Sequence, residues 1–272
     1  MSTSTEWQLA HEAAERYETI LVPAILGPFA RALVDWSNLH PGETVVDVGC
    51  GTGTAARYAA ERVGPAGRVI GVDINAGMIG VAGSIPPSPE SAPVEWYENS
   101  AYQLFLDDNA AGVALCAQTL QFLADRGQAL SEMYRVLQPA GRVAVSLWCA
   151  IEENPYFQVL LEAVARHVGP ETAAGLGTAF GLTSAEEIQT LMAGAHFQNI
   201  VTTVMQLDLA LPELAAFVPR HISATPMSAG YVAAGAAAQQ AVVDEIVVQL
   251  AEYQTGQGVQ IPFRSHLAMA VK

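Results

Sequence analysis

The sequence predicts an α/β protein whose central β-sheet is mostly parallel and covered by helices on both faces. Short apolar runs typical of strands alternate with helical segments between residues 44 and 148. A glycine-rich loop, DVGCGTGT at residues 47–54, directly follows the first of these runs. Apolar residues make up 51% of the 272 positions, which is enough to bury a large core. Together these observations predict a doubly wound sheet.

The expected elements follow in order along the chain. Apolar side chains in the first 36 residues have helical spacing, and Pro23 and Pro28 are expected to divide this segment into two or three short helices. The strands expected after a turn at residues 40–43 are residues 44–48, 68–72, 94–98, 112–117 and 142–148. The helices expected between them are residues 54–63, 76–82 and 126–137. Crossovers of this kind are right-handed and make successive strands parallel.

The pattern changes after residue 148. Helices are expected at residues 155–167 and 184–195, a strand at 199–209, a mostly helical stretch at 212–253, and a last strand at 263–271. Roughly fifty residues separate the last two strands, far more than in an ordinary connection. We expect this insertion to be a functional cap, although a purely structural elaboration is the alternative.

The charge of the chain limits its partners. The formal net charge is −15, from 12 basic and 27 acidic residues. This balance argues against a nucleic-acid partner and against docking on anionic membranes, both of which need a basic surface. It is compatible with a small-molecule ligand and mildly favours a cationic one.

The N-terminus is polar and carries both signs of charge, unlike a signal or transit peptide, and no stretch reads as a transmembrane helix. We therefore expect a cytoplasmic protein. Cys50, Cys116 and Cys149 are expected to be reduced residues in or near the core, and no metal is predicted. The alternative is that these three thiols converge on a thiophilic metal or metalloid, which nothing in their spacing supports.

The glycine loop indicates a ligand at the carboxyl edge of the sheet, where ligands of open parallel sheets bind. A dinucleotide site would need a third glycine at the position of Thr54, and Asp47 would repel a diphosphate. S-adenosylmethionine fits better, because Asp47 could orient its ammonium group. The backbone that would lie against the methionine portion is that of Gly49, Cys50, Gly51 and Gly53.

A second acid closes the second expected strand. Asp73 has two carboxylate oxygens that could accept hydrogen bonds from the two ribose hydroxyls of the same ligand. The alternative for Asp73 taken alone is a helix N-cap. Ile74 and Met78 follow on the adjacent turn and could sandwich the adenine.

These motifs resemble those of the class I S-adenosylmethionine-dependent methyltransferases, and within them the group containing the ubiquinone and menaquinone biosynthesis methyltransferases. The resemblance lies in VVDVGCGTG at 45–53, GVD at 71–73, Met78, and EMYRVLQPAGR at 132–142. It runs from about residue 17 to residue 148. It implies a Rossmann-like sheet of seven strands in which the last strand is antiparallel.

The resemblance divides the chain into three regions. Residues 1–40 would be N-terminal helices that form a lid, and residues 41–150 the S-adenosylmethionine-binding core. Residues 151–272 would hold the remaining strands and helical substrate-cap insertions at about 151–196 and 210–262.

The chain departs from the family pattern in two places. Asn99-Ser100-Ala101 stands where an acid before alanine often binds the adenine amino group, so Ser100, Ala101 or nearby backbone would take that role. Ala111-Gly112 stands where the family often has Phe-Asp at the start of the fourth strand. This difference implies different packing there and not a loss of function.

The resemblance also implies several wall residues. Gln118 would lie beside the methyl donor, Gln121, Phe122 and Trp148 would border the acceptor, and Tyr17 would close a lid over the donor. Core packing is the alternative for the aromatic residues. If a catalytic base is required, His221 is the first candidate, because it lies in the long insertion.

The expected function is methyl transfer to a small, largely apolar molecule such as a phenol, a quinol or another secondary metabolite. Aromatic residues of the cap would favour such an acceptor if they pointed inward. The alternatives are a fold relative that uses S-adenosylmethionine for a different reaction and, less favoured, a nicotinamide-dependent dehydrogenase. The sequence does not indicate an oligomeric state.

Overall fold

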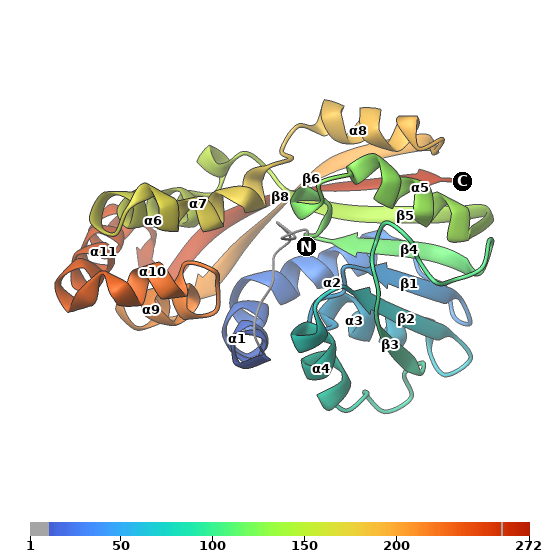
Figure 1. The fold of residues 1–272 in the computed structure, drawn as a ribbon, viewed down its shortest axis with the longest axis horizontal. Helices are drawn as coiled ribbons and strands as arrows, with labels where there is room; N and C mark the ends of the chain where they lie inside the picture. The colour runs from blue at the N-terminus through green and yellow to red at the C-terminus, as the bar shows by residue number, and fades with distance from the viewer. Residues whose placement is uncertain (1–10, 257) are drawn as a thin grey trace, which may run out of the picture.

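The computed structural model describes residues 11–256 and 258–272. Its centre is one sheet with the order β3-β2-β1-β4-β5-β8-β6, shown in Figure 1. The strands are β1 (Thr44–Val48), β2 (Arg68–Asp73), β3 (Val94–Glu98), β4 (Ala111–Ala117), β5 (Leu137–Trp148), β6 (Gln198–Leu211) and β8 (Gly258–Val271). A two-residue strand, β7 (Gln254–Thr255), pairs with β8 alone.

The strand directions confirm the fold class. The strands β1 to β5 pair in parallel, whereas β8 is antiparallel to both β5 and β6. The seven-stranded, mostly parallel sheet with an antiparallel last strand is therefore as the resemblance implied.

Helices cover both faces of this sheet because its strands are apolar on both sides. Val45 packs with α2 (Gly27–Trp36) and α3 (Thr54–Val63) on one face. Its neighbour Val46 points to the other face, where α5 (Arg126–Val136) and α8 (Ala185–Gly194) contribute to a second core cluster. The short helix α4 (Ala76–Ser84) follows β2.

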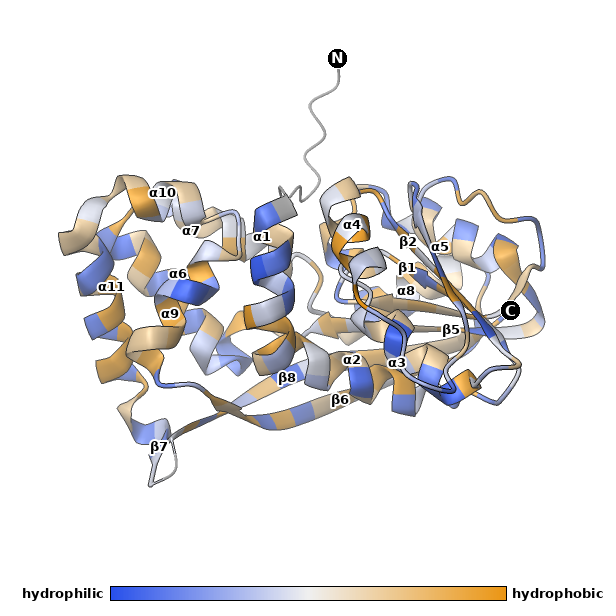
Figure 2. Ribbon diagram, turned by 90° about the horizontal axis from the view of Figure 1, so that it is seen from below, coloured by the Kyte–Doolittle hydropathy of each residue, from blue (hydrophilic) through white to orange (hydrophobic). Residues whose placement is uncertain are grey.

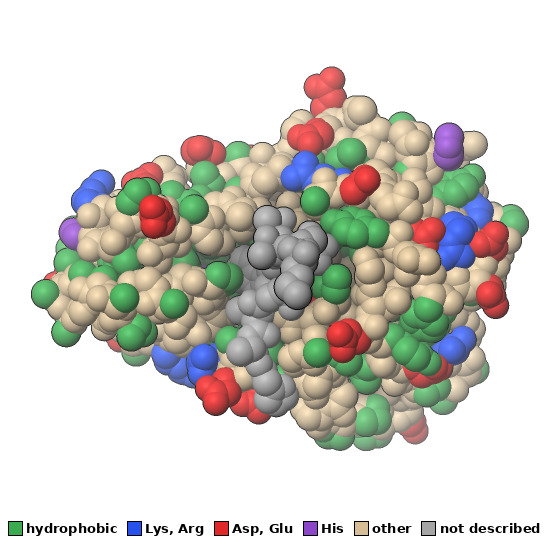
Figure 3. Space-filling view, viewed as in Figure 1, with side chains coloured by type: hydrophobic (Ala, Val, Ile, Leu, Met, Phe, Trp, Pro, Cys, Tyr) green, Lys and Arg blue, Asp and Glu red, His purple; other side chains and the backbone are tan. Residues whose placement is uncertain are grey.

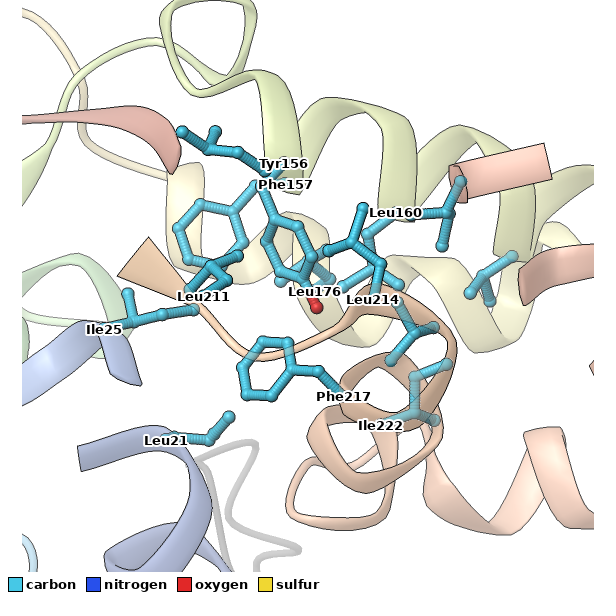
Figure 4. Close-up of a cluster of buried hydrophobic side chains, with 14 of the residues drawn as sticks. Leu21, Ile25, Tyr156, Phe157, Leu160, Leu176, Leu211, Leu214, Phe217 and Ile222 are labelled. Atoms are coloured by element: carbon cyan, nitrogen blue, oxygen red, sulfur yellow. The ribbon is translucent and has the colours of Figure 1, made fainter. Parts of the chain in front are cut away.

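A second body of helices lies at one end of the molecule, around the projecting ends of β6 and β8 (Figures 1 and 2). These cap helices are α6 (Pro155–His167), α7 (Pro170–Gly177), α9 (Leu214–Ser223), α10 (Ser228–Ala233) and α11 (Gly235–Gln249). Their apolar side chains form one buried cluster, part of which is shown in Figure 4. The first insertion was expected to be wholly cap, but its helix α8 packs on the sheet beside α5 instead.

Short 3₁₀ helices connect the larger elements. They are η2 (Leu120–Phe122), η3 (Ile151–Glu153), η4 (Thr178–Phe180) and η5 (Ala251–Tyr253).

The N-terminal helices differ from the sequence prediction. A short α1 (His11–Arg16), a π-helix η1 (Tyr17–Leu26) and α2 follow one another without a break. Pro23 lies inside η1 and does not end the helix, and Pro28 occupies the first turn of α2, where a missing N–H is tolerated. The wider turns of a π-helix usually mark functional segments, and η1 borders the cavity described below.

This N-terminal stretch is also apolar. Residues Glu12–Trp36 have the length and mean hydropathy (1.3) that a membrane span would need, contrary to the sequence expectation. Half of the most apolar window is buried within the fold. Its buried side chains, such as Leu21 and Leu33, belong to the core clusters of the cap and of the sheet, so packing against the rest of the chain accounts for the composition.

The start of β5 is a further difference. Residues 138–141 were expected to separate the helix at 126–137 from the strand at 142–148, but they belong to the strand as a bulge, because Ala111 pairs with Leu137 and Val113 pairs with Arg142. Ala140 takes up the extra length with a φ of +63°, a left-handed conformation that is uncommon for alanine.

Candidate functional site

A cavity of about 200 Å³ opens at the carboxyl ends of β1, β2 and β4. One side consists of residues predicted to bind the cofactor: Tyr17, Gly49, Cys50, Gly51, Asp73, Ile74, Met78, Ser100, Ala101 and Gln118. The other side includes the residues predicted near the acceptor: Gln121, Phe122, Trp148 and His221. Two predicted residues, Asp47 and Gly53, do not border the cavity. We call these two sides the cofactor wall and the acceptor wall.

The glycine loop connects β1 to α3 through left-handed backbone. The amides of Gly49 and Cys50 donate hydrogen bonds to the carbonyl oxygen of Val72 at 2.8 and 3.0 Å, which fixes the loop to β2. Gly51 has a φ of +54°, and a Cβ atom there would have no heavy atom within 4 Å. The peptide at Gly51 is therefore the bare backbone that faces open space.

The other two glycines have internal reasons to be glycine. A Cβ atom on Gly49 (φ +71°) would overlap the side chain of Thr119, and one on Gly53 (φ +86°) would overlap the indole of Trp96. Gly53 is the N-cap of α3 and lies behind the cavity. The prediction that all three glycines admit a ligand is therefore wrong for Gly53.

Asp73 organises the cofactor wall at the end of β2. Its Oδ2 accepts a hydrogen bond from the amide of Gly51 at 2.8 Å, and its Oδ1 accepts one from the amide of Asn75 at 2.8 Å. The N-cap of α4 is Asn75, whose side chain accepts from the amide of Met78, so the N-cap alternative does not apply to Asp73. A carboxylate oxygen can accept more than one hydrogen bond, so these contacts orient Asp73 without excluding hydroxyl donors.

Asp47 is buried beneath the loop and does not border the cavity. Of the two ways in which Asp47 could orient a ligand's ammonium group, directly or through water, this arrangement does not provide the direct contact. Burial raises the pKa of Asp47 to about 7, with a smaller contribution from the charge of Asp73, and the backbone N–H of Ala56 partly offsets the shift. No described residue makes a hydrogen bond of normal geometry to either carboxylate oxygen. An acid that is half protonated near neutral pH is a poor counter-charge.

The region predicted for adenine lies between α4 and the loop after β3. Ile74 is 42% exposed, whereas Met78 is buried, so an apolar slot is open on one side. The hydroxyl of Ser100 accepts a hydrogen bond from the amide of Tyr102 at 3.2 Å. The amide of Asn99 donates to the carbonyl oxygen of Asp73 at 3.0 Å, which ties this loop to the end of β2.

Sequence reasoning missed two residues that support this wall. Asn75 was detectable, because an Asn before a helical segment is a typical N-cap. Trp96 was not detectable, since its contact with Gly53 joins segments that are far apart in the sequence. Thr119, whose side chain contacts Gly49, belongs to the segment after the fourth strand that was expected to border the donor.

Two glutamines connect the cofactor wall to the acceptor wall. The side-chain amide of Gln118 donates to the hydroxyl of Ser265 on β8 at 2.9 Å, and that of Gln121 donates to Oε1 of Gln118 at 3.1 Å. Gln118 has a φ of +52°, a left-handed conformation that turns the chain after β4. Hydrogen bonds to neighbours thus orient the polar groups on this side.

His221 reaches the acceptor wall from α9 in the cap. Its Nδ1 lies 3.0 Å from the hydroxyl of Tyr156 on α6. Burial alone lowers the pKa of His221 to about 3, so the ring is neutral at physiological pH. His221 therefore borders the cavity, as a catalytic base would have to, but its lowered pKa makes it a weak base.

The cap aromatic residues do not point into the cavity as the sequence interpretation allowed. Tyr156, Phe157 and Phe217 pack against one another inside the cap, with ring centroids 5.7 and 5.9 Å apart for the two pairs that include Tyr156. Trp148 borders the cavity and connects it to this cluster, since its ring makes edge contacts with those of Phe29 and Phe157, at interplanar angles of 77° and 63°. The alternative, core packing, therefore holds for the cap aromatics.

The charge of the cavity wall is low. Among the described lining residues, Asp73 is the only carboxylate and there is no lysine or arginine. The three thiols do not form a metal site with other ligands in the described part of the chain. Burial raises the pKa of Cys116 and Cys149 to about 12, so these thiols are protonated.

Comparison with known proteins agrees with this geometry. Residues 46–145 match a family described as methyltransferase domain. These residues are a methyltransferase domain. The domain contains the glycine loop, Asp73 and the strands β2 to β4, so it supplies the whole cofactor wall except for Tyr17 and the rest of η1.

The methyltransferase domain has relatives named for quinone chemistry. The chain is 35% identical over 144 residues to a 2-phytyl-1,4-naphtoquinone methyltransferase of Thermosynechococcus vestitus, covering 50% of this chain and 63% of that protein. It is 32% identical over 139 residues to a demethylmenaquinone methyltransferase of Symbiobacterium thermophilum, covering 50% and 55%. The chain spans about half the length of the curated relatives that it matches.

A solved structure extends the likeness in fold beyond the methyltransferase domain. Phosphoethanolamine N-methyltransferase 2 of Haemonchus contortus, bound to S-adenosylhomocysteine, superimposes with a TM-score of 0.61 and 18% identity. The superposition covers 97% of this chain and 57% of that one. At this identity the likeness supports the fold alone, so the cap and its substrate have to be argued from the residues present.

Proposed function

We propose that the protein binds S-adenosylmethionine against the cofactor wall and transfers its methyl group to a small, uncharged, largely apolar molecule. The observation that carries this proposal is the pairing of Gly51 with Asp73. An open peptide and a carboxylate from adjacent strands are hydrogen-bonded to each other at 2.8 Å and face the same cavity. S-adenosylmethionine suits this combination. Its ribose has two vicinal hydroxyls that can donate to the carboxylate, and its sulfur carries a positive charge.

The arrangement assigns roles to the residues present. Asp73 would accept hydrogen bonds from the ribose, Ile74 and Met78 would border the adenine, and the Gly51 peptide would lie along the methionine portion. The donor supplies an activated methyl group when bound. The protein then has to align the acceptor and exclude water. An apolar cavity bordered by η1 would do both.

The acceptor would be uncharged because no described lining residue could pair with a phosphate, a carboxylate or, on the acceptor wall, an ammonium group. Leaving such a charge unpaired in an apolar cavity would cost several kcal/mol. The names of the curated relatives point in the same direction, toward quinone-type molecules. No continuous basic patch is visible among the described residues on the face in Figure 3, so a nucleic-acid acceptor has no support there.

Two other functions are distinguishable by experiment. A fold relative could bind the same cofactor but catalyse a different reaction, and a dehydrogenase would bind a nicotinamide nucleotide instead. The diphosphate of the latter would lie beside the carboxylate of Asp73 in a cavity wall with no lysine or arginine among its described residues, which disfavours it. The cytoplasmic location expected from the sequence stays a prediction.

Calorimetry with S-adenosylhomocysteine and NADH tests the proposal. We expect S-adenosylhomocysteine to bind and NADH not to bind. At a hundredfold excess over its Kd, a specific ligand raises the free energy of unfolding by about 2.7 kcal/mol. Asp73→Asn should abolish most of this stabilisation, because it removes the charge from a hydrogen-bonding carboxylate.

Asp125→Asn is the matched control, since Asp125 is the N-cap of α5 and does not border the cavity. Unchanged affinity in the Asp73 variant, or binding of NADH at the same site, would contradict the proposal. Transfer of labelled methyl from S-adenosylmethionine to 1,4-naphthoquinol then separates methylation from other uses of the cofactor.

A further inference from the structure

The hydrogen bond between Tyr156 and His221 determines what the acceptor wall can recognise. Both side chains are almost completely buried, at 0% and 2% exposure. Tyr156 comes from α6 and His221 from α9, so two separate insertions contribute to one polar contact inside the cap. Figure 4 shows the surrounding cluster, with Tyr156, Phe157 and Phe217 drawn among leucines.

The position of the proton on His221 follows from the partners available. The hydroxyl of Tyr156 has one hydrogen to donate, and Nδ1 of His221 is the only hydrogen-bond partner found for it among the described residues. If Nδ1 carried a proton, the buried tyrosine hydroxyl would have no acceptor, at a cost of about 1–3 kcal/mol. The favoured arrangement is therefore a tyrosine O–H that donates to Nδ1, which places the imidazole proton on Nε2.

The surroundings of His221 keep the ring neutral. The rings of Tyr156, Phe217 and Phe157 lie 5.4, 5.8 and 6.2 Å from the imidazole centroid. Burial is the cause of the lowered pKa, and no charged group contributes to the shift. The one charged side chain in the described cavity wall, Asp73, belongs to the cofactor wall.

The remaining nitrogen is the one available to a ligand. The His221 ring borders the cavity, and its Nε2 makes no hydrogen bond to a described residue. The neighbouring polar group on the same helix end, the hydroxyl of Thr225, donates to the carbonyl oxygen of Ile222 at 2.8 Å. Nε2–H is therefore a hydrogen-bond donor of the acceptor wall with no partner of its own among the described residues.

We propose that His221 is a fixed, neutral N–H donor rather than a base, and that the uncharged acceptor molecule is recognised through a carbonyl or phenol oxygen. The proposal rests on the methyltransferase function proposed above. Tyr156 is a positioning residue, because it acts through the tautomer of His221. A neutral donor in an apolar cavity binds that oxygen and orients the acceptor toward the methyl group without a proton being transferred.

Nuclear magnetic resonance of ¹⁵N-histidine-labelled protein tests the tautomer directly. At pH 7, without any added ligand, His221 should show a protonated Nε2 and an unprotonated Nδ1, and the loss of these signals in His221→Gln assigns them. Tyr156→Phe removes the donor and should shift the ring toward a mixture of tautomers. A wild-type ring protonated on Nδ1, or on both nitrogens, would overturn the proposal whether or not the variants fold.

The substrate class is tested with two probes that differ in one oxygen, 1-tetralone and tetralin. In the presence of S-adenosylhomocysteine, the wild type should bind the ketone about tenfold more tightly than the hydrocarbon, as expected for one hydrogen bond. His221→Leu should lose this preference, while its affinity for S-adenosylhomocysteine stays unchanged.

The outcomes separate this inference from the proposed function. Equal binding of both probes, binding of neither, or a preference that persists in the leucine variant would each contradict recognition of an oxygen by His221. Failure of S-adenosylhomocysteine itself to bind would instead contradict the proposed function, and the tautomer measurement does not depend on it.

Discussion

The two walls of the cavity are built in different ways. The cofactor wall comes mainly from consecutive segments of one domain: the glycine loop, the end of β2 and the loop after β3. The acceptor wall combines η2, the end of β5, α7 and α9, which are separated by up to a hundred residues. The first wall is polar and holds a carboxylate, whereas the second is apolar with neutral polar groups.

The difference between the two walls limits where a charged group of a ligand could bind. Asp73 is oriented by backbone amides and remains in the cavity wall, while Asp47 one strand away is buried without a hydrogen bond. On the acceptor side the titratable group is a histidine that burial keeps neutral. The cationic cofactor proposed above therefore suits the first wall, and the uncharged acceptor proposed above suits the second.

The largest expected effect concerns the buried acid beneath the cofactor wall. The pKa of Asp47 is about 7 in the folded protein, against an ordinary value of 3.8. Between these values the folded state keeps a proton that the unfolded state has lost, so stability declines as pH rises. A shift of this size corresponds to about 4 kcal/mol above pH 7.

Asp47→Asn should remove this dependence. We expect the variant to be no more stable than the wild type at pH 4 but more stable by up to about 4 kcal/mol at pH 8. Urea unfolding at both pH values measures the difference. If the difference in unfolding free energy between the two proteins were the same at both pH values, Asp47 would ionise normally in the folded state.

The second effect separates two glycines of the same loop. Gly49→Ala combines a left-handed φ with overlap of Thr119 and should cost about 3 kcal/mol of unfolding free energy. Gly51→Ala has the φ penalty alone, about 1–2 kcal/mol, because its methyl group would meet open space. It should weaken binding of S-adenosylhomocysteine instead, since that space is where the ligand would lie. Equal losses of stability would contradict the distinction.

The fold was largely predictable because its signals are local. The alternation of apolar strands and amphipathic helices between residues 44 and 148 is visible in the sequence, and the positions of β1 to β4 agree closely with it. The failures have physical causes. Pro23 lies within a π-helix, which no local sequence pattern predicts. The residues before 142 form a bulge in β5, and this bulge depends on pairing with β4.

Part of the geometry of the candidate site was predictable. Asp73 and Gly51 both border one cavity, since both lie at strand ends that the parallel sheet brings to one edge, although the hydrogen bond between them was not foreseen. The proton on His221 was not predictable, because it depends on Tyr156, which is 65 residues away. The burial of Asp47 was missed because its position next to glycines suggests access, while its side chain points to the opposite side of the loop from the cavity wall.

The third effect concerns His221 in the acceptor wall. Its ionisation changes the stability with pH in the opposite direction to that of Asp47. Because the folded pKa of His221 is about 3 and the ordinary value is 6.5, the unfolded state gains a proton below pH 6.5 that the folded state does not. Stability is therefore lost as pH falls, by about 2 kcal/mol at pH 5. His221→Gln should abolish this loss, and His40→Gln, at an exposed position, is the control. Identical acid sensitivity in the wild type and the His221 variant would show that the ring titrates normally.

The smallest effect concerns the contact that joins η1 to the cofactor wall. Arg57 on α3 donates to the carbonyl oxygen of Thr52 at 2.6 Å and to the carboxylate of Glu18 on η1 at 2.7 Å. Both side chains of this ion pair are about four-fifths buried, at 18% and 19% exposure, so the pair is worth more than one at the surface.

Glu18→Gln keeps the shape but removes the charge. It should cost about 1 kcal/mol and weaken binding of S-adenosylhomocysteine about fivefold, because η1 would hold less firmly over the glycine loop. Asp35→Asn breaks the exposed pair between Asp35 and Arg62 and should change neither quantity measurably. If the two variants behaved alike in calorimetry, closure of η1 over the cavity would depend on the apolar contacts of Leu21 and Ile25 with the cap rather than on this ion pair.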